Sequence, residues 1–570
     1  MVRALADTLP DAERQGLAQA FGRKLVSSWW AASCLKRKAS LKLRNPPQAF
    51  EPYAPSETLG GVADTIGRRA GQLEPEIAAY QIGLIYTSLL PSAYRSENGI
   101  YYTPPVLTQR LIELASETGV DWKSCRVLDP ACGGGAFLAP VAKHIIGQMP
   151  ECSPRILLEN LSNRLRGYEI DPFGAWLAQV TLDVVLLPIY SATGKKTPCL
   201  VTQCNSLRKN PPRAGFDLVI GNPPYARTQL APELREKFKR GIYGHANLYG
   251  VFTDAALRFV RPGGVIAFVT PTSFLAGAYF KNLRALLGFA APPKHLDFVA
   301  ARQHVFDDVL QETLLATYQR DSERSPVKVR ELHVHTPQKL SAKELGTIDL
   351  PATPSLPWIL PRSSEQVTTV QVLQRCRHTL ADWGYTVSTG PLVWNRHKGQ
   401  IFQHKARNRL PLIWAESVRP DGRFSWRAHK KNHEPWFEIR NVDSWLVSRQ
   451  QCVLLQRTTA KEQHRRLIAA TLPKDFIRQH GGVVVENHLN MLKPLDTAPR
   501  VAPDVLAEFL NSKAADQAFR CVSGSVAVSA YELEALPLPP PGALARLHGL
   551  ISAGATRQAI ENECQRLYRG

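Results

Sequence analysis

A short segment that joins an apolar strand to a rigid turn has residue types suited to holding a planar amino group. Residues 216–221 predict a buried strand, and Asn222, Pro223, Pro224 and Tyr225 follow it directly. Because proline has no backbone N–H, the turn offers carbonyl oxygens and one side-chain amide oxygen. It can accept both hydrogens of an exocyclic amine, and the tyrosine ring offers a stacking face worth roughly 1–3 kcal/mol per base. These four candidate catalytic residues predict a site for the amino group of a nucleobase.

Such a turn can also simply end a strand, and what favours the chemical interpretation is a second motif upstream. Residues 126–138 predict a buried strand, a glycine turn and a helix, which is the arrangement that holds a ligand at the carboxyl edge of a parallel sheet. The glycine spacing matches neither the dinucleotide fingerprint nor the phosphate loop of nucleotide triphosphatases. A nucleoside ligand without phosphates fits this turn better.

A second predicted strand ends in an acidic residue, Glu169. A carboxylate in this place can accept hydrogen bonds from a ribose diol. The separation from Asp129 exceeds the usual value of about 20 residues, which indicates an insertion over residues 151–163. The alternative is a solvated acid at the end of a strand, but the preceding glycine turn favours the ribose role.

Taken in order, these motifs resemble those of the S-adenosylmethionine-dependent amino-methyltransferases. They are most similar to the gamma-class DNA adenine-N6 group of type II restriction-modification systems, typified by the TaqI methyltransferase. The resemblance covers roughly residues 96–320. The matching segments are residues 98–105, 129–135, 167–172, 221–225, 247–252 and 261–271.

The resemblance implies S-adenosylmethionine as the cofactor. Thr103 and Asp129 would lie near its methionine end, and Glu169 would hold its ribose. Asn205 stands where the family usually has an Asp that contacts the adenine amino group, and an Asn oxygen can still accept from an amine. The candidate cofactor-binding residues are Thr103, Asp129, Ala131, Cys132, Gly133, Gly135, Glu169 and Asn205.

The reaction implied is direct methyl transfer to a nitrogen that is a poor nucleophile. Hydrogen bonds to the Asn222 side-chain oxygen and the Pro223 carbonyl would localise the lone pair and strengthen as positive charge develops. An amine inside a duplex is reached only if its base is flipped out, at a cost of a few kcal/mol. Tyr225 would stack on that base, and Phe306 resembles the family's second aromatic; an ordinary core phenylalanine is the alternative for Phe306.

Composition agrees with a nucleic-acid partner. The chain has 570 residues and a formal net charge of +21, and basic side chains that neutralise phosphates release counterions. An acidic membrane is the competing partner, but the sequence shows neither an apolar run of about 20 residues nor a signal-peptide core. The ten cysteines form no C-x-x-C, so we expect a reducing cytosol, no disulfide framework and no metal site.

The order of the patterns predicts four regions. Residues 1–95 are a helical region without a recognisable nuclease pattern, and residues 96–335 alternate strands with helices. The latter predict the catalytic domain, an α/β fold with a doubly wound, mostly parallel, Rossmann-like sheet. Residues 336–365 are expected to be a linker, and residues 366–570 a mixed α+β target-recognition domain that ends in a helical tail.

The last region is basic and contains interspersed tryptophans, which is typical of surfaces that contact DNA. For each of these residues alone, an ordinary solvated surface is the alternative. His488 lies in an apolar stretch, and a metal role for it is disfavoured. The candidate DNA-binding residues are Trp394, Arg396, Lys398, Arg427, Lys430 and Arg457.

Three functional hypotheses follow. The first is an adenine-N6 DNA methyltransferase of a prokaryotic cytosol, acting on double-stranded DNA beside a separately encoded restriction endonuclease of the same specificity. The second is a methyltransferase for another amine or amide: cytosine N4, an RNA base or a protein glutamine. The third is a non-enzymatic DNA-binding module, against which the intact motifs argue.

Overall fold

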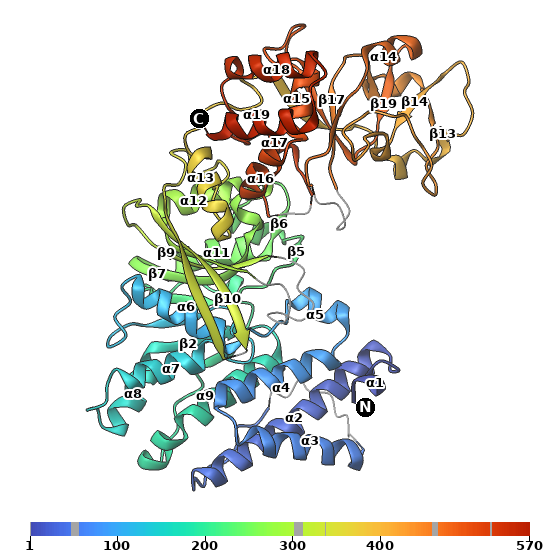
Figure 1. Ribbon diagram of the computed structural model, residues 1–570. Coiled ribbons are helices and arrows are strands. Elements are labelled where there is room, and N and C mark those ends of the chain that lie inside the picture. The colour runs from blue at the N-terminus through green and yellow to red at the C-terminus, as the bar shows by residue number, and fades with distance from the viewer. Residues whose placement is uncertain are drawn as a thin grey trace. The chain divides into compact units, whose positions relative to one another are not determined.

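The computed structural model describes residues 2–46, 56–300, 312–336, 338–458, 465–524 and 527–569. The chain divides into two compact units: Met1–Phe274 with Tyr279–Ser355, and Leu275–Ala278 with Leu356–Gly570 (Figure 1). The glycine and proline motifs lie in the first unit. The basic region with interspersed tryptophans lies in the second.

In the described part of the first unit, nine strands form one sheet in the order β11-β10-β8-β9-β7-β4-β1-β2-β3. Neighbouring strands from β7 to β3 are parallel, and β9 is antiparallel to both β7 and β8. This confirms the expected doubly wound, mostly parallel α/β sheet. The strands are β1 (Val127–Asp129), β2 (Leu165–Glu169), β3 (Val201–Gln203), β4 (Phe216–Gly221), β7 (Val260–Pro271), β8 (Pro293–Val299), β9 (Thr313–Gln319), β10 (Val327–Thr336) and β11 (Lys339–Ile348).

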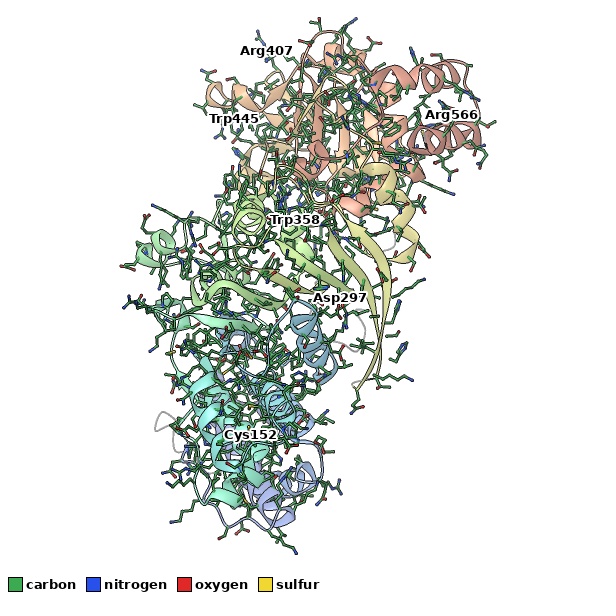
Figure 2. All side chains as sticks on the ribbon, turned by 90° about the vertical axis from the view of Figure 1, so that its left-hand side faces the viewer. Cys152, Asp297, Trp358, Arg407, Trp445 and Arg566 are labelled. Atoms are coloured by element: carbon green, nitrogen blue, oxygen red, sulfur yellow. The ribbon has the colours of Figure 1, made fainter. Side chains whose placement is uncertain are left out.

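Helices pack against this sheet and bury its apolar side chains. α6 and β1 contribute Leu107, Leu111 and Val127 to one hydrophobic cluster. Arg110 of α6 donates to the buried Asp297 of β8, labelled in Figure 2, at 2.9 Å. The helices that follow the N-terminal region are α6 (Pro105–Glu117), α7 (Leu138–Gly147), α8 (Pro154–Arg164), α9 (Pro172–Thr193), α10 (Pro232–Lys237), α11 (Leu248–Phe259) and α12 (Lys281–Ala290), and a short ribbon pairs β5 (Arg227–Thr228) with β6 (Ala246–Asn247).

The N-terminal region is helical, as expected, and packs directly on the catalytic fold. Its helices are α1 (Val2–Ala6), α2 (Asp11–Lys36), α3 (Glu57–Ala70), α4 (Pro75–Leu89) and α5 (Ser92–Asn98). Trp29 and Tyr86 share a hydrophobic cluster with Phe173 of α9. The Tyr86 and Phe173 rings stack with their centroids 4.0 Å apart.

Helix α9 corrects one expectation from the sequence. Its 22 residues are long and apolar enough to cross a membrane by length and composition, whereas we expected no such run. However, 89% of its most apolar window is buried inside the first unit. The helix is apolar all round because α2, α4, α7, α8 and the sheet contact it, as is typical of a core helix.

The expected linker also needs a correction. Residues 339–348 form β11, which pairs antiparallel with β10, so the first part of the expected 336–365 segment belongs to the sheet. Polar side chains on most of β11 hide this strand from a hydrophobicity pattern, because it lies at the edge of the sheet. A segment without regular helix or strand follows, over residues 349–363.

The second unit has the expected mixed α+β composition. One sheet has the order β12-β20-β17-β18, and another has the order β13-β15-β14-β19-β16. Its strands are β12 (Tyr385–Thr389), β13 (Ile401–Phe402), β14 (Arg409–Ile413), β15 (Trp436–Glu438), β16 (Val447–Ser448), β17 (Val453–Gln456), β18 (Ala469–Thr471), β19 (Val483–Val485) and β20 (Leu489–Pro494). Its helices are α13 (Val367–Leu373), α14 (Lys474–His480), α15 (Pro503–Leu510), α16 (Lys513–Val522), α17 (Ala530–Glu534), α18 (Ala545–Ser552) and α19 (Arg557–Arg569).

Candidate active site

The candidate catalytic turn, residues 222–225, begins where β4 ends beside β1. A Cβ at Gly221 would lie 2.7 Å from the carboxylate oxygen of Asp129, so only glycine lets these two strand ends approach so closely. The next residue, Asn222, donates from its side-chain nitrogen to the Thr103 hydroxyl at 3.0 Å. This contact joins two motifs that are 119 residues apart, and it places a side-chain oxygen at the end of β4.

Tyr225 lies differently from the sequence expectation. Its hydroxyl donates to the Asn222 side-chain oxygen at 2.5 Å and to the Val269 carbonyl at 3.3 Å. Its ring packs edge to face on Tyr249, with centroids 6.1 Å apart, and burial raises the pKa of its hydroxyl. The tyrosine hydroxyl therefore occupies one of the two acceptor positions of the oxygen that we expected to accept the target amine.

The glycine turn wraps around the end of β1. Gly133 and Gly135 have φ angles of +50° and +88°, which favour glycine. Asp129 accepts from the backbone N–H of Ala131 at 3.1 Å. Its other oxygen is buried and has no hydrogen-bond partner within the described ranges. Burial raises the pKa of this carboxyl well above its ordinary value.

Glu169 closes the turn from the neighbouring strand. Its carboxylate accepts from the backbone N–H groups of Gly133 at 2.7 Å and of Ile170 and Asp171 at 2.8 Å. Burial raises the pKa of Glu169 to about 7, although these N–H groups act in the opposite direction. Of about four acceptor positions on a carboxylate, three are used, and the remaining position is available to a ligand.

Asp171 is a supporting residue that sequence reasoning did not assign. It accepts from the Gly174 N–H at 2.7 Å at the start of α9, and from the hydroxyls of Tyr94 at 3.0 Å and Tyr86 at 3.4 Å. These tyrosines lie on α5 and α4, so the N-terminal helices hold the segment that follows Glu169. A possible signal was Asp171 before Pro172, a combination typical of a helix N-terminus.

One cavity of about 260 Å³ connects the two motifs. Glu169 and Asn205 line it together with the catalytic turn. The Asn205 side-chain oxygen accepts from the Leu207 N–H at 3.0 Å, so it also caps the following turn. Of the expected site residues, the lining includes Ala131, Gly133, Glu169, Asn205, Asn222 and Pro224. Phe306 lies outside the described residues.

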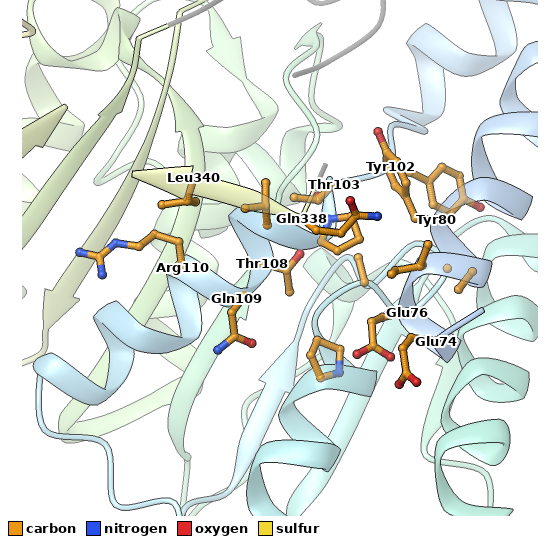
Figure 3. A pocket seen from close by; sticks show the side chains of 18 of the residues that line it. Glu74, Glu76, Tyr80, Tyr102, Thr103, Thr108, Gln109, Arg110, Gln338 and Leu340 are labelled. Carbon is orange, nitrogen blue, oxygen red and sulfur yellow. The ribbon is translucent and has the colours of Figure 1, made fainter. Parts of the chain in front are cut away.

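A second cavity of about 440 Å³ borders the glycine turn (Figure 3). Thr103, Gly134 and Gly135 line it, and Glu74 and Glu76 contribute carboxylates from the N-terminal helices. Tyr102 borders both cavities. These two carboxylates are already paired with Lys143, at 3.0 and 2.8 Å.

The candidate DNA-binding residues of the second unit have different environments. Arg396, Lys398, Arg427 and Lys430 are exposed, whereas Trp394 is half-buried and packs edgewise on Trp414. Arg457 is also half-buried and donates to the Asn487 carbonyl at 2.9 Å, which gives it a structural contact. His488 pairs with the buried Glu486 at 2.6 Å. Within the described ranges, no three metal-binding side chains gather in one place.

Comparisons with known proteins agree with this arrangement. Residues 200–306 match the model of the Eco57I restriction-modification methylase family. The type II methyltransferase M.BsuBI of Bacillus subtilis is 26% identical over 477 residues, or 78% of this chain and 88% of that protein. M.PstI of Providencia stuartii, also a type II methyltransferase, is 26% identical over 360 residues, which is 61% of this chain and 70% of that protein.

Solved structures show the same fold over most of the chain. The type IIL restriction-modification enzyme MmeI, solved with DNA, has a TM-score of 0.54 at 12% identity, covering 100% of this chain and 94% of that one. A DrdV–DNA complex has a TM-score of 0.50 at 12% identity, and the match covers 96% of this chain and 67% of that one.

Proposed function

We propose that this chain, which groups with the type II restriction-modification methylases as a DNA methyltransferase, methylates the N6 amino group of an adenine flipped out of duplex DNA. S-adenosylmethionine would be the methyl donor. The observation that supports the proposal best is the cavity that joins Glu169 and the glycine turn to Asn222 and Pro224. It brings residues suited to a nucleoside next to an acceptor suited to an amine.

The residues around this cavity fit the proposed cofactor. Glu169 has an acceptor position for a ribose hydroxyl, and Asn205 has an amide that can bond an adenine edge. Gly133 lets the backbone approach a ligand closely because it has no side chain. When bound, S-adenosylmethionine supplies a methyl group made electrophilic by its sulfonium.

Asn222 would hold the target amine. Its nitrogen is engaged by Thr103, which orients its oxygen for the amine, and the Pro223 carbonyl would accept the second hydrogen. Such bonds strengthen as positive charge develops on the nitrogen, so they favour the transition state over the ground state. The Asn222 oxygen has two acceptor positions and the Tyr225 hydroxyl uses one of them, so the amine would take the other or displace the hydroxyl. The Tyr225 ring would stack on the base.

DNA would be held by the basic second unit, as the net charge of +21 favours. The relatives named above are type II methyltransferases by name, and the matching family model is that of a restriction-modification methylase. We therefore place this chain in the cytosol of a prokaryote, beside a separately encoded endonuclease of the same specificity. The same amine chemistry serves cytosine N4, which makes that base the second candidate.

Sequencing that detects modified bases tests the proposal. The chain is expressed in cells that lack DNA methylation, and methylated adenine is expected at one short motif. Asn222→Ala is expected to lose transfer by at least about a hundredfold, while cofactor affinity measured by calorimetry stays within about threefold of wild type. If the methyl group is found on cytosine instead, cytosine N4 and not adenine N6 is the target amine. Unmodified DNA from cells with soluble, cofactor-binding protein would refute the proposal.

A further inference from the structure

Residues 427–434 form a loop of the second unit whose cations are exposed and whose backbone is fixed; we call it the basic loop. Arg427, Lys430 and Lys431 are exposed, and the one carboxylate within the loop is Glu434, at its last position. It follows β14 and precedes β15, and Asn432 adopts a φ of +68° within it. A loop with exposed cations and a defined backbone is suited to a partner with regularly spaced negative charge.

The loop is held from beneath by one carboxylate, Glu416, whose side chain is 4% exposed. Its Oε1 accepts from the backbone N–H of His429 at 2.7 Å and of Lys430 at 3.3 Å. Its Oε2 lies 3.0 Å from Nδ1 of His433 and 4.0 Å from Nζ of Lys430. One buried side chain thus contacts both ends of the turn that carries Lys430 and Lys431.

Two further contacts fasten the loop to the core of the unit. The His433 ring stacks on the fully buried Trp414, with centroids 3.8 Å apart and an angle of 10° between the planes. Ser417 bonds the backbone of Arg427, accepting from its N–H at 3.2 Å. Burying a carboxylate is unfavourable unless it is paired, and Glu416 directs its acceptor positions to this loop.

We propose that Glu416 is a positioning residue that presents the basic loop to the phosphates of duplex DNA, with Lys430 and Lys431 making the contacts. The inference rests on the proposed function, because it names the surface by which a DNA methyltransferase would hold its substrate. Lysine acts at a phosphate as a point charge, and a fixed backbone reduces the entropy lost when two lysines are immobilised. Glu416 itself does not touch DNA.

The test is the salt dependence of duplex binding by the full-length protein, measured by fluorescence anisotropy. Removing one cation that binds a phosphate reduces the slope of log affinity against log salt by about 0.9. Lys430→Ala with Lys431→Ala is expected to reduce the slope by about 2. Glu416→Ala is expected to reduce it by about 1–2 and to lower affinity about tenfold near 0.15 M salt.

Matched variants separate positioning from loss of fold. Glu416→Gln keeps an oxygen for the two backbone N–H groups, so affinity is expected within about threefold of wild type. Glu438→Ala is the control, because this carboxylate of the same unit pairs instead with Arg409 at 3.6 Å. In methyl transfer, Glu416→Ala is expected to raise KM for DNA and leave kcat within about twofold.

A wild-type salt slope in either Glu416→Ala or the double lysine variant would overturn the inference. The lysine variant changes only exposed side chains, so its result stands even if Glu416→Ala fails to fold. If the wild-type protein binds and methylates DNA, and Glu416→Ala does both equally well, this inference alone is refuted. A wild-type protein that neither binds nor methylates duplex DNA would refute the proposed function, and the inference with it.

Discussion

At the scale of single residues, the side chain expected to grip the target amine is already engaged at both of its polar atoms. Asn222 bonds Thr103 through its nitrogen and Tyr225 through its oxygen. The first contact orients the amide, and the second uses one of the two acceptor positions of the oxygen, for which the target amine would compete. Tyr225 therefore has two opposing effects: its ring favours the base and its hydroxyl competes with it.

Tyr225→Phe separates these effects because it keeps the ring and removes the hydroxyl. One neutral hydrogen bond is worth about 1 kcal/mol, so a duplex with an unpaired adenine at the target is expected to bind up to about fivefold more tightly. Tyr225→Ala removes the ring as well and is expected to lose roughly 1–3 kcal/mol. Binding of both variants is measured with the same duplex. Weaker binding by Tyr225→Phe would show that the hydroxyl assists the base.

Glu169 predicts a pH dependence of cofactor affinity. With its pKa near 7, it is largely protonated at pH 6 and ionised at pH 8, and only the ionised form accepts freely from ribose hydroxyls. Affinity for the nucleoside is therefore expected to rise about tenfold from about pH 6 to 8. The probe is 5′-methylthioadenosine, which has no group that titrates in this range. Glu169→Gln is expected to bind weakly at every pH.

The same carboxyl affects the stability of the cofactor-free protein. Its pKa is about 7 in the folded state against an ordinary value of 4.5, so the folded state binds more protons between these values. Its contribution to the free energy of unfolding is complete below pH 4.5 and is lost as the pH rises through about 7.

The binding experiment has one outcome that would contradict this pKa. If wild-type affinity for 5′-methylthioadenosine does not change with pH, the three backbone N–H groups keep Glu169 ionised throughout.

At the scale of elements, the N-terminal helices support the proposed cofactor site. α4 and α5 provide the tyrosines that bond Asp171, and α2 packs against both α4 and α3. At the α2–α3 contact, a Cβ on Gly67 would lie 2.4 Å from the Leu25 carbonyl oxygen. A glycine inside a helix is therefore required here for close packing.

Gly67→Ala is expected to lower the free energy of unfolding by about 1–3 kcal/mol, because the added methyl forces α2 and α3 apart. The control is Gly61→Ala in the same helix, where nothing lies within 4 Å of the new Cβ. That variant is expected to gain about 0.5–1 kcal/mol from helix propensity. The free energies of unfolding of the two variants and the wild type are compared by denaturant unfolding, monitored by tryptophan fluorescence. Equal stabilities would mean that the helices adjust to the methyl without cost.

At the scale of the whole molecule, the excess of 70 Lys and Arg over 49 Asp and Glu predicts strongly salt-dependent DNA binding. With about 6–10 phosphate contacts, affinity is expected to fall by about 10³–10⁵ between about 50 and 200 mM salt. Binding of 5′-methylthioadenosine, which carries no phosphate, is expected to change less than about twofold. Fluorescence anisotropy measures duplex binding, and calorimetry measures the binding of 5′-methylthioadenosine. Duplex binding that is insensitive to salt would show that these charges serve another purpose.

Several features could be predicted because they depend on residues close together in the sequence. The strand, glycine turn and helix at residues 126–138 and the strand before Asn222 were found from apolar runs and punctuating glycines and prolines. The edge strand β11 was missed because its side chains are polar. The full apolarity of α9 was missed because a helix buried on all sides has no amphipathic period.

The sequence by itself determined the order of the motifs, the acceptor-rich turn and the positive charge, because each is a property of residue type and local spacing. Only the tertiary structure decided that Thr103 orients Asn222, that the Tyr225 hydroxyl bonds the Asn222 side-chain oxygen, and that Tyr94 supports Asp171. It likewise decided that Glu416 holds the basic loop. The bonds from Asn222 to Thr103 and from Tyr94 to Asp171 join segments 119 and 77 residues apart in the chain. Such contacts form only when the sheet and its helices pack, and a single sequence carries no direct signal of that packing.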